Sequence, residues 1–303
     1  MERIDLFTTI EITDFRGFRQ LKLEGLQRVN LVVGLNNAGK TGLLEAVVLA
    51  CDPNKWPALP GLLRSTSGNP GSRFLRWLVR DGATGEAEVC VASGGRRVVV
   101  KIGRDTHQGV AIADTKGWGA CQVISVQMRK PEELVHVYAR AARLQSGEEQ
   151  IQALLHAVDG RVKKVRVDVG DDGSHLLVDL GLSEMIPLSQ AGQGLNRLVA
   201  ILSEIIGEKP QVCLLDEVEN GLHYSVYEEV WTGIAEAATL MNVQVIATTH
   251  SRECLEAAHR AFSRRDPYDL SVVQLFRVEG GPQGRVLDKK LIAAALAGDI
   301  DLR

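Results

Sequence analysis

The segment 34–41 constrains the fold more than any other part of this 303-residue chain. It reads Gly-Leu-Asn-Asn-Ala-Gly-Lys-Thr, which is the P-loop pattern. An apolar, β-branched run at 29–33 precedes it, and good helix formers continue from Gly42 to residue 50. Glycines let backbone N–H groups converge on an anion, and the following helix adds its positive end. We therefore predict a buried strand, a phosphate-binding loop and a helix.

The residues of this loop have separate predicted roles toward a nucleotide. Lys40 would reach the β- and γ-phosphates, and the Thr41 hydroxyl would ligate Mg²⁺. The alternative, a glycine-rich turn with an incidental lysine, does not explain the flanking strand and helix. The predicted nucleotide-binding set is Gly34, Asn36, Asn37, Ala38, Gly39, Lys40, Thr41 and Gly42.

Two acids follow an apolar strand predicted at 211–215. Asp216 at the strand tip can hold Mg²⁺, and Glu217 can polarise an attacking water as a general base. Many strands end in acids, so the alternative is a pair of solvated loop carboxylates. The presence of a P-loop in the same chain favours the functional interpretation.

A histidine follows the strand predicted at 243–248, one helix and one strand after Asp216. The next strand tip of a parallel sheet should lie there, so His250 could hydrogen-bond the γ-phosphate and the attacking water. The alternative is a surface or core histidine without a ligand role.

A second glycine-rich turn, at 188–194, leads into a helix predicted at 195–206. Ser189, Gly192 and Gly194 would bind phosphate at the helix N-terminus. A second phosphate-binding turn makes sense if it serves the nucleotide of another subunit. The alternative is that Ser189 only caps the helix.

In this order, the four motifs resemble those of ABC-type ATPase heads of the SMC/RecF branch. Three segments, 30–41, 216–223 and 247–251, are also similar to the ATPase domain of the overcoming-lysogenization-defect (OLD) nucleases. The resemblance covers nearly the whole chain. It implies an α/β fold with a mixed, largely parallel sheet of the P-loop NTPase type, an N-terminal antiparallel β-subdomain and a helical signature region. One domain would span 1–303, with an insertion carrying a β-hairpin at 51–120 and a helical signature lobe at 130–206.

The resemblance also implies residue roles. Gly34 to Thr41 would be Walker A, Asp216 the Walker B ligand of Mg²⁺, Glu217 the catalytic base and His250 the switch histidine, with Lys40 assisting catalysis. Ser189, Gly192 and Gly194 would form the signature, acting across an ATP-dependent homodimer. The D-loop would lie at 220–223. Gln127 is the predicted Q-loop ligand of Mg²⁺, with Gln122 as the alternative, and Arg16-Gly17-Phe18 would approach the nucleotide.

The chain departs from the family pattern in several places. Its signature reads Ser-Gln-Ala-Gly-Gln-Gly rather than Ser-Gly-Gly-Gln, and His223 stands where many ABC heads have an aspartate. A long heptad insertion and the Toprim nuclease half of OLD proteins are missing from the sequence. Asp168, Asp171 and Asp172 suggest a metal cluster, but Asp-Gly between two apolar runs is more typical of a hairpin.

Composition limits the class of protein, its partners and its expected location. Hydrophobic residues make up 45% and charged residues 24%, which is typical of a packed globular protein. A net charge of −3 gives no nucleic-acid signal, and the basic stretches 161–166 and 264–265 are expected to be solvated faces. Five scattered cysteines predict reduced thiols, and the chain shows neither a signal peptide nor an apolar run long enough for a membrane. We therefore expect a cytoplasmic protein without membrane contact.

Other elements follow from hydrophobic period and turn residues. We predict strands at 8–14, 19–25, 86–92, 96–102, 123–126, 163–169, 175–180 and 271–278, and helices at 73–80, 132–158 (one or two), 225–238, 251–262 and 290–297.

Two functional hypotheses follow. The first is an ATPase that uses ATP and Mg²⁺, dimerises head to tail, and acts with a separate nuclease or Toprim-like effector in DNA metabolism or phage defence. Nucleic-acid binding remains open under this hypothesis. The second is a nucleotide-gated binding switch that recruits a partner with little turnover. Glu217 and His250 favour the first, because a switch needs neither.

Overall fold

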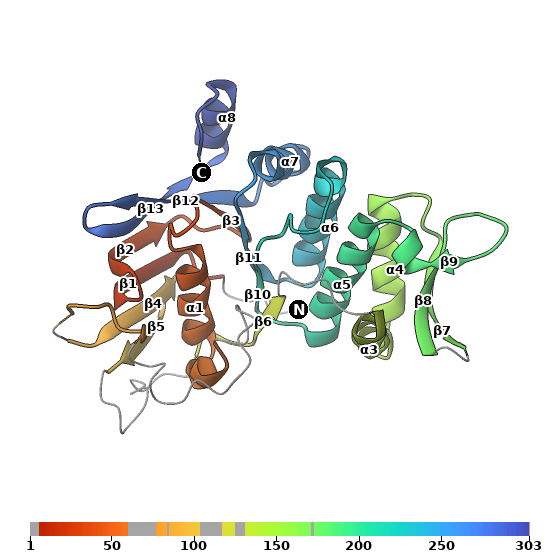
Figure 1. The fold of residues 1–303 in the computed structure, drawn as a ribbon, viewed down its shortest axis with the longest axis horizontal. Coiled ribbons are helices and arrows are strands. Elements are labelled where there is room, and N and C mark those ends of the chain that lie inside the picture. The colour runs from red at the N-terminus through yellow and green to blue at the C-terminus, as the bar shows by residue number, and fades with distance from the viewer. Residues whose placement is uncertain are drawn as a thin grey trace.

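The computed structural model describes residues 6–59, 77–83, 85–103, 117–124, 131–170 and 173–302, and the statements below concern these residues. A six-stranded sheet forms the middle of the molecule (Figure 1). Its order is β13-β12-β3-β11-β10-β6, formed by β3 (Val29–Val33), β6 (Cys121–Ile124), β10 (Val212–Leu215), β11 (Gln244–Thr249), β12 (Leu270–Val278) and β13 (Gly281–Leu287). All neighbours pair in parallel except β12 and β13, so the carboxyl ends of β3, β11 and β10 meet at one edge.

An antiparallel sheet forms the N-terminal part, in the order β2-β1-β4-β5. Its strands are β1 (Thr9–Phe15), β2 (Phe18–Glu24), β4 (Ala87–Ser93) and β5 (Arg96–Ile102). The hairpin β4–β5 was expected inside an insertion at 51–120. Instead, β4 pairs with β1 from Thr9↔Ala92 to Thr13↔Glu88, so the hairpin completes the N-terminal sheet. Other helices and strands separate β1 from β4 in the sequence. Local sequence patterns therefore do not reveal that the two strands pair.

The helix predicted at 73–80 is not formed where the structure describes it. Trp77 has a 3₁₀ conformation, residues 78–80 are not helical, and Val79 makes an antiparallel bridge to Phe15. Residues 73–76 lie outside the described part. Val79 pairs with Phe15 of the N-terminal sheet, and its apolar side chain is buried there and not on the face of a helix.

Two hydrophobic cores lie on opposite faces of the central sheet. Val29, Leu31 and Val33 of β3 contribute to one core, whereas Val32 contributes to the other. This division follows from the alternation of side chains along a strand. The second core also contains the inner face of the N-terminal sheet and helix α1 (Lys40–Cys51), which is buried from Gly42 onward.

Helices contribute side chains to the core on the other face of the central sheet. They are α3 (Pro131–Ala142), α4 (Gly147–Val158), α5 (Gln193–Glu208), α6 (Tyr227–Leu240), α7 (Arg252–Ser263) and α8 (Lys289–Ala297). Short 3₁₀ turns are η1 (Pro53–Ala58), which contacts α1, η3 (Leu188–Gln190) and η4 (Tyr224–Val226). The region 132–158 forms two helices, because the chain turns at Ser146 and only glycine fits at 147, where a Cβ would lie 2.0 Å from the Ala141 carbonyl oxygen. The hairpin β7 (Lys164–Gly170) and β8 (Gly173–Asp179) is confirmed, and β9 (Ile186–Pro187) joins it in a small sheet at the far end of the helical part (Figure 1).

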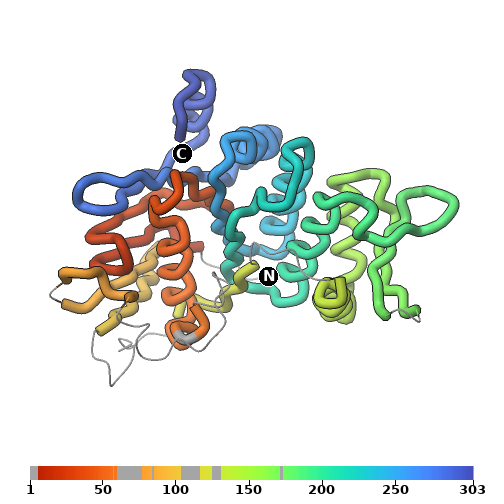
Figure 2. The backbone as a smooth tube through the Cα atoms, in the orientation of Figure 1, coloured from red at the N-terminus to blue at the C-terminus, as the bar shows by residue number. Residues whose placement is uncertain are grey.

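The C-terminal segment leaves the sheet after β13. Figure 2 shows the chain turning away from the sheet edge so that α8 projects from the body of the molecule. Strand β13 was not predicted, because Pro282 and Gly284 disfavour strands in sequence terms. Gly284 is closely packed there, since a Cβ would lie 2.8 Å from Leu275 Cδ2. Among the described residues, none of the helices combines the length and hydrophobicity needed to cross a lipid bilayer.

Candidate functional site

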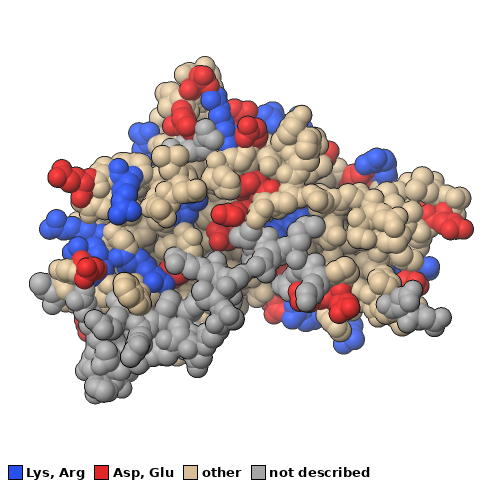
Figure 3. All heavy atoms as spheres, in the orientation of Figure 1, with Lys and Arg blue, Asp and Glu red and all other residues tan. Residues whose placement is uncertain are grey.

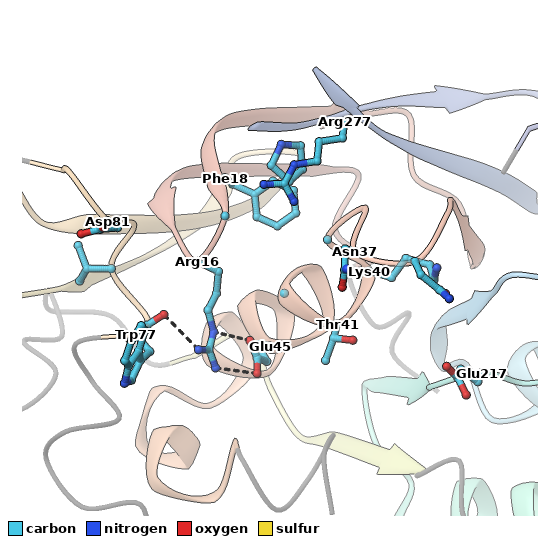
Figure 4. A pocket seen from close by; sticks show the side chains of 16 residues that line it. Arg16, Phe18, Asn37, Lys40, Thr41, Glu45, Trp77, Asp81, Glu217 and Arg277 are labelled. Atoms are coloured by element: carbon cyan, nitrogen blue, oxygen red, sulfur yellow. Dashed lines mark hydrogen bonds and ion pairs between the residues drawn. The ribbon is translucent and has the colours of Figure 1, made fainter. Parts of the chain in front are cut away.

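An open cavity of about 1090 Å³ lies over the start of α1. Figure 4 shows Lys40 and Thr41 at the helix start, Glu217 facing them from the end of β10, and Arg16, Trp77 and Asp81 at the opposite end. The other lining residues are Gly17, Phe18, Asn36, Asn37, Gly39, Gly42, Glu45, Val79, Arg277 and Pro282. The cavity therefore joins the P-loop, the β1–β2 turn, the β12–β13 hairpin and the Asp-Glu strand end.

The P-loop fits its surroundings only because of its glycines. A Cβ on Gly34 would lie 2.5 Å from the carbonyl oxygen of Leu275, and Gly39 has a φ of 105° and faces Phe18 Cζ at 2.8 Å. Helix α1 begins at Lys40 without a side-chain cap. The N–H groups of its first turn are therefore left for an anion, as the sequence predicts for a phosphate-binding loop.

Lys40 is held over its own loop. Its Nζ donates to the carbonyl oxygens of Gly34, at 2.6 Å, and Leu35, at 3.2 Å. Burial lowers the pKa of Lys40 below its ordinary value, while the carboxylates of Glu219, Glu217 and Asp216 oppose this shift. The ammonium group thus lies among three acids next to the cavity.

One threonine hydroxyl organises both acids that follow β10. Thr248 Oγ1 donates to Asp216 Oδ1 at 2.6 Å and accepts from the backbone N–H of Glu217 at 2.8 Å. Asp216 is buried, and Glu217 has a φ of 45°, in the left-handed region that non-glycine residues rarely adopt. Such strain is typical of functional positions. Sequence analysis missed Thr248, whose one signal is its place at a strand tip two residues before His250.

His250 lies at the end of β11, between β3 and β10 in the sheet. Its backbone N–H donates to Glu219 Oε1 at 2.8 Å, and its Nδ1 is 3.1 Å from the same oxygen. The imidazole is half exposed and does not line the cavity over α1. Glu219 was also missed, although it stands in the same acidic stretch, two residues after Glu217.

The second glycine-rich turn lies away from this cavity. Helix α5 begins at Gln193 with Gly192 as its N-cap, so the interpretation of Ser189 as the cap is wrong. Ser189 lies on the 3₁₀ turn η3 and is exposed. Gly194 has a packing reason for being glycine, because a Cβ would lie 2.9 Å from Val226 Cγ2. Gly192 and Gly194 line a separate groove of about 310 Å³ together with His223.

The structure describes one of the two glutamines considered for the Q-loop. Gln127 lies outside the described residues. The alternative, Gln122, is on β6, where its side-chain amide donates to Glu204 on α5 at 3.1 Å. Glu204 is buried, so Gln122 has a structural partner on the helical side of the sheet.

Arg16 closes one side of the cavity through a buried ion pair. Its Nε and Nη2 donate to the two carboxylate oxygens of Glu45 at 2.6 and 2.8 Å, and Nη1 donates to the Trp77 carbonyl oxygen at 3.1 Å (Figure 4). Glu45 is fully buried in α1. Sequence analysis placed Arg16, Gly17 and Phe18 near the nucleotide, and all three line the cavity. Glu45 was missed and is detectable only as one acid in an apolar helix.

Replacement of Arg16 by leucine is expected to lower the free energy of unfolding by about 3–5 kcal/mol, because the Glu45 charge would stay buried without its partner. Urea denaturation measures this. The double variant Arg16→Leu/Glu45→Leu should recover most of the loss, since no unpaired charge remains. A single-variant loss below about 1 kcal/mol, the range of a surface pair, would contradict the assignment.

The basic stretches singled out in the sequence include paired arginines. Arg264 and Arg265 form ion pairs with Glu228 and Glu236, and Arg161 pairs with Asp159 at 2.7 Å. On the face shown in Figure 3, basic side chains gather over the N-terminal sheet, and acidic ones lie near the middle of the view. Within the described residues no cluster of three or more His, Cys, Asp and Glu side chains is arranged to hold a metal ion, and Asp171 and Asp172 lie outside them. All five cysteines are buried free thiols.

Comparisons with known proteins agree with this architecture. Residues 133–255 match a family described as an AAA ATPase domain. The chain is 21% identical over 334 residues to an ATP/GTP phosphatase of Helicobacter pylori, covering 86% of this chain and 90% of that protein. It is 31% identical over 100 residues to the DNA replication and repair protein RecF of Gloeobacter violaceus, covering 33% of this chain and 26% of that protein.

A solved SMC head bound to the C-winged helix domain of ScpA is similar in structure. The TM-score is 0.62 at 12% identity, over 94% of this chain and 98% of that chain. The fold is therefore that of an ABC-ATPase head, as the sequence predicts. The family match over 133–255 supports an ATP-binding ATPase with this fold. The closer resemblance to OLD proteins stays a prediction.

Proposed function

We propose that this chain binds ATP with Mg²⁺ in the cavity over α1 and hydrolyses it within a homodimer assembled head to tail. One observation carries the proposal: Lys40 and Thr41, which follow β3, and Glu217, which follows β10, line the same cavity. These strands are not neighbours in the sheet, and His250 follows β11, which lies between them. Phosphate-binding and water-activating residues thus come from separate strands to one place.

The residues present fit a nucleoside triphosphate. The uncapped start of α1 and the Lys40 ammonium suit the phosphates, and the cavity continues past Arg16 and Phe18 to the exposed Trp77 ring. We place the triphosphate against the P-loop and the nucleoside toward Arg16 and Trp77. An aromatic face and a guanidinium at this end suit the stacking of a base.

Thr41 and Asp216 would hold Mg²⁺, and Gln127 is the proposed additional ligand. Oxygen donors are what this ion prefers, and the Thr248 hydroxyl keeps the Asp216 carboxylate oriented. Mg²⁺, when bound, neutralises charge on the phosphates. The chain itself supplies Lys40 for the charge that develops on the γ-phosphate, Glu217 to orient and deprotonate water, and His250 as a further hydrogen-bond partner of that water.

The second glycine-rich turn supports a dimer. Ser189 and Gly192 do not line the cavity of their own chain, yet the start of α5 has no side-chain cap and suits an anion. A partner's signature turn placed on the γ-phosphate would complete each site, and a twofold axis would form two such sites at once. ATP held by both chains would then favour the closed dimer, and ADP would release it.

Ser189→Arg is expected to reduce hydrolysis by about 100-fold, because the larger cationic side chain blocks closure on the partner's nucleotide. Binding of ATP to the monomer should stay within about twofold, since Ser189 is absent from the cavity of its own chain. Steady-state hydrolysis and fluorescence titration with a labelled ATP measure the two effects. Ser263→Arg, on the exposed end of α7, is the matched control. Equal activity of the two variants would contradict the trans role.

The alternative function is a nucleotide-gated switch with little turnover. Glu217 in the cavity favours hydrolysis, because nucleotide binding alone requires no base there. An absence of turnover in both the wild type and Glu217→Gln would support the switch instead.

A separate effector is part of the proposal. The SMC head neighbour is bound to a domain of ScpA, which shows that a head of this fold can carry a second protein. We propose that ATP turnover here controls a separate nuclease or Toprim-like effector in DNA metabolism or phage defence. Sequence similarity to RecF and the predicted OLD resemblance support this direction.

A further inference from the structure

We infer that Glu219 is a positioning residue for His250, whose main chain and imidazole it holds in one orientation and one tautomer. The inference rests on the proposed function, in which His250 hydrogen-bonds the attacking water through Nε2. It adds a residue that the motif pattern does not assign. The carboxylate acts through the histidine and does not itself touch the nucleotide.

Both nitrogen contacts of His250 converge on one oxygen. Glu219 Oε1 accepts from the His250 backbone N–H at 2.8 Å and lies 3.1 Å from Nδ1. An ionised carboxylate has no proton to donate, so this contact requires the hydrogen to be on Nδ1. The two contacts also fix the ring torsion relative to the backbone. The half-exposed ring therefore turns Nε2 away from Glu219, as a nitrogen free for a ligand.

Packing alone does not explain a carboxylate at this position. Glu219 is 6% exposed, and its Oε2 is buried without a hydrogen-bond partner among the described residues. Burial of a charge with one oxygen unsatisfied lowers stability, so an apolar side chain would serve the fold better. Buried charges retained at such a cost are typical of functional sites. The charge also acts on Lys40, because it opposes the effect of burial on the pKa of that lysine.

The contact is the last of a series that joins the segment after β10 to the end of β11. The Glu217 N–H donates to Thr248 Oγ1 at 2.8 Å, and the Val218 N–H donates to the Thr248 carbonyl oxygen at 3.1 Å. A turn bond from Leu222 N–H to the Glu219 carbonyl oxygen, at 3.0 Å, steadies the residue itself. Glu219 therefore sets the position of His250 relative to Glu217.

The first test reads the tautomer without ATP. Protein with ¹⁵N-labelled imidazole rings is studied by NMR at a pH where the rings are neutral, and His250→Gln identifies its signal among the seven histidines. We expect the Nδ1–H form in the wild type and in Glu219→Gln, because the amide oxygen still accepts. Glu219→Ala should shift the ring toward the Nε2–H form. If Glu219→Ala does not fold, Glu219→Asp withdraws the carboxylate and serves the same comparison.

The second test separates positioning from structure by kinetics. Glu219→Ala should lower kcat for ATP hydrolysis by about 10- to 100-fold, with KM changed by less than about threefold. Glu219→Gln should stay within about fivefold of the wild type, as the conservative variant that rescues the contact. In a His250→Ala background, Glu219→Ala should change kcat by less than about twofold, because its target is gone. Glu256→Gln, a carboxylate on α7 that pairs with Arg252, is the unaffected control.

The two tests contradict the inference in different ways. An Nδ1–H ring that persists in both Glu219→Ala and Glu219→Asp would overturn it. Losses that multiply in the double variant would overturn it as well, since they show independent action. A wild-type protein without ATPase activity contradicts the proposed function only, and the tautomer measurement then still decides the role of Glu219.

Discussion

Lys40→Ala is expected to abolish measurable ATP hydrolysis and to weaken ATP binding. In the structure the ammonium group binds two carbonyl oxygens of its own loop, so it is already aimed at the anion-binding space over α1. Its loss removes the main cation for the β- and γ-phosphates while Asp216, Glu217 and Glu219 remain close by. Removal of one such donor costs about 10²- to 10³-fold in rate, and the remaining acids would also repel the triphosphate.

Phosphate release under steady-state conditions measures the rate, and titration with a fluorescent ATP analogue measures affinity. Lys101→Ala, on the exposed face of β5, is the matched lysine control and should leave both unchanged. Unfolding curves of the two variants should agree with those of the wild type, since among the described residues the Lys40 ammonium donates only to carbonyl oxygens of its own loop. Hydrolysis near the wild-type rate in Lys40→Ala would contradict the P-loop assignment.

Glu217→Gln is expected to reduce turnover by about 10²- to 10⁴-fold and to trap an ATP-bound dimer. The amide keeps the size and leaves the backbone bond from residue 217 to Thr248 Oγ1 intact, so the loop should keep its shape. Only the proton acceptor for the attacking water is lost. ATP would then persist between the two chains, and the dimer should accumulate because its ligand is not consumed.

Sedimentation or light scattering of Glu217→Gln with ATP and Mg²⁺, and separately with ADP, measures this. We expect a doubled mass with ATP and monomer mass with ADP. Glu217→Gln combined with Ser189→Arg is the control that should remain monomeric with ATP. An unchanged mass in both nucleotides, or a dimer indifferent to Ser189→Arg, would contradict the head-to-tail arrangement.

Predictions from the sequence succeeded where short-range physics sets the outcome. The loop 34–41 and helix α1 follow from residue order, because their hydrogen bonds join near neighbours. Strand β3 was predicted from its run of apolar, β-branched residues, although its hydrogen-bond partners β11 and β12 are distant in the sequence. The hairpin β7–β8 follows from Asp-Gly between alternating runs in the same way. The boundaries of α3 and α4 needed the structure, because the break depends on the close contact of Gly147 with Ala141.

Predictions were wrong or incomplete where contacts with residues distant in the sequence determine the structure. Strand β4 pairs with β1, which no sequence pattern in 87–93 indicates, and Val79 bridges to that sheet where a helix was predicted. Thr248 and Glu219 are ordinary residues in sequence. They matter because β11 lies between β3 and β10, which brings the segment after Asp216 against the end of β11.

The identity of the chemical groups was therefore readable in the residue order: a lysine and a threonine after a glycine-rich loop, two acids after one strand and a histidine after another. Their arrangement depended on the order of strands in the sheet, which is set by long-range burial on both faces of β3. Which charges are buried and paired, such as Glu45 with Arg16 and Glu219 with His250, also depended on folding. The sequence alone does not show whether a carboxylate lies in solvent or in a core. Its neighbours in the folded structure decide whether it is solvated, paired or catalytic.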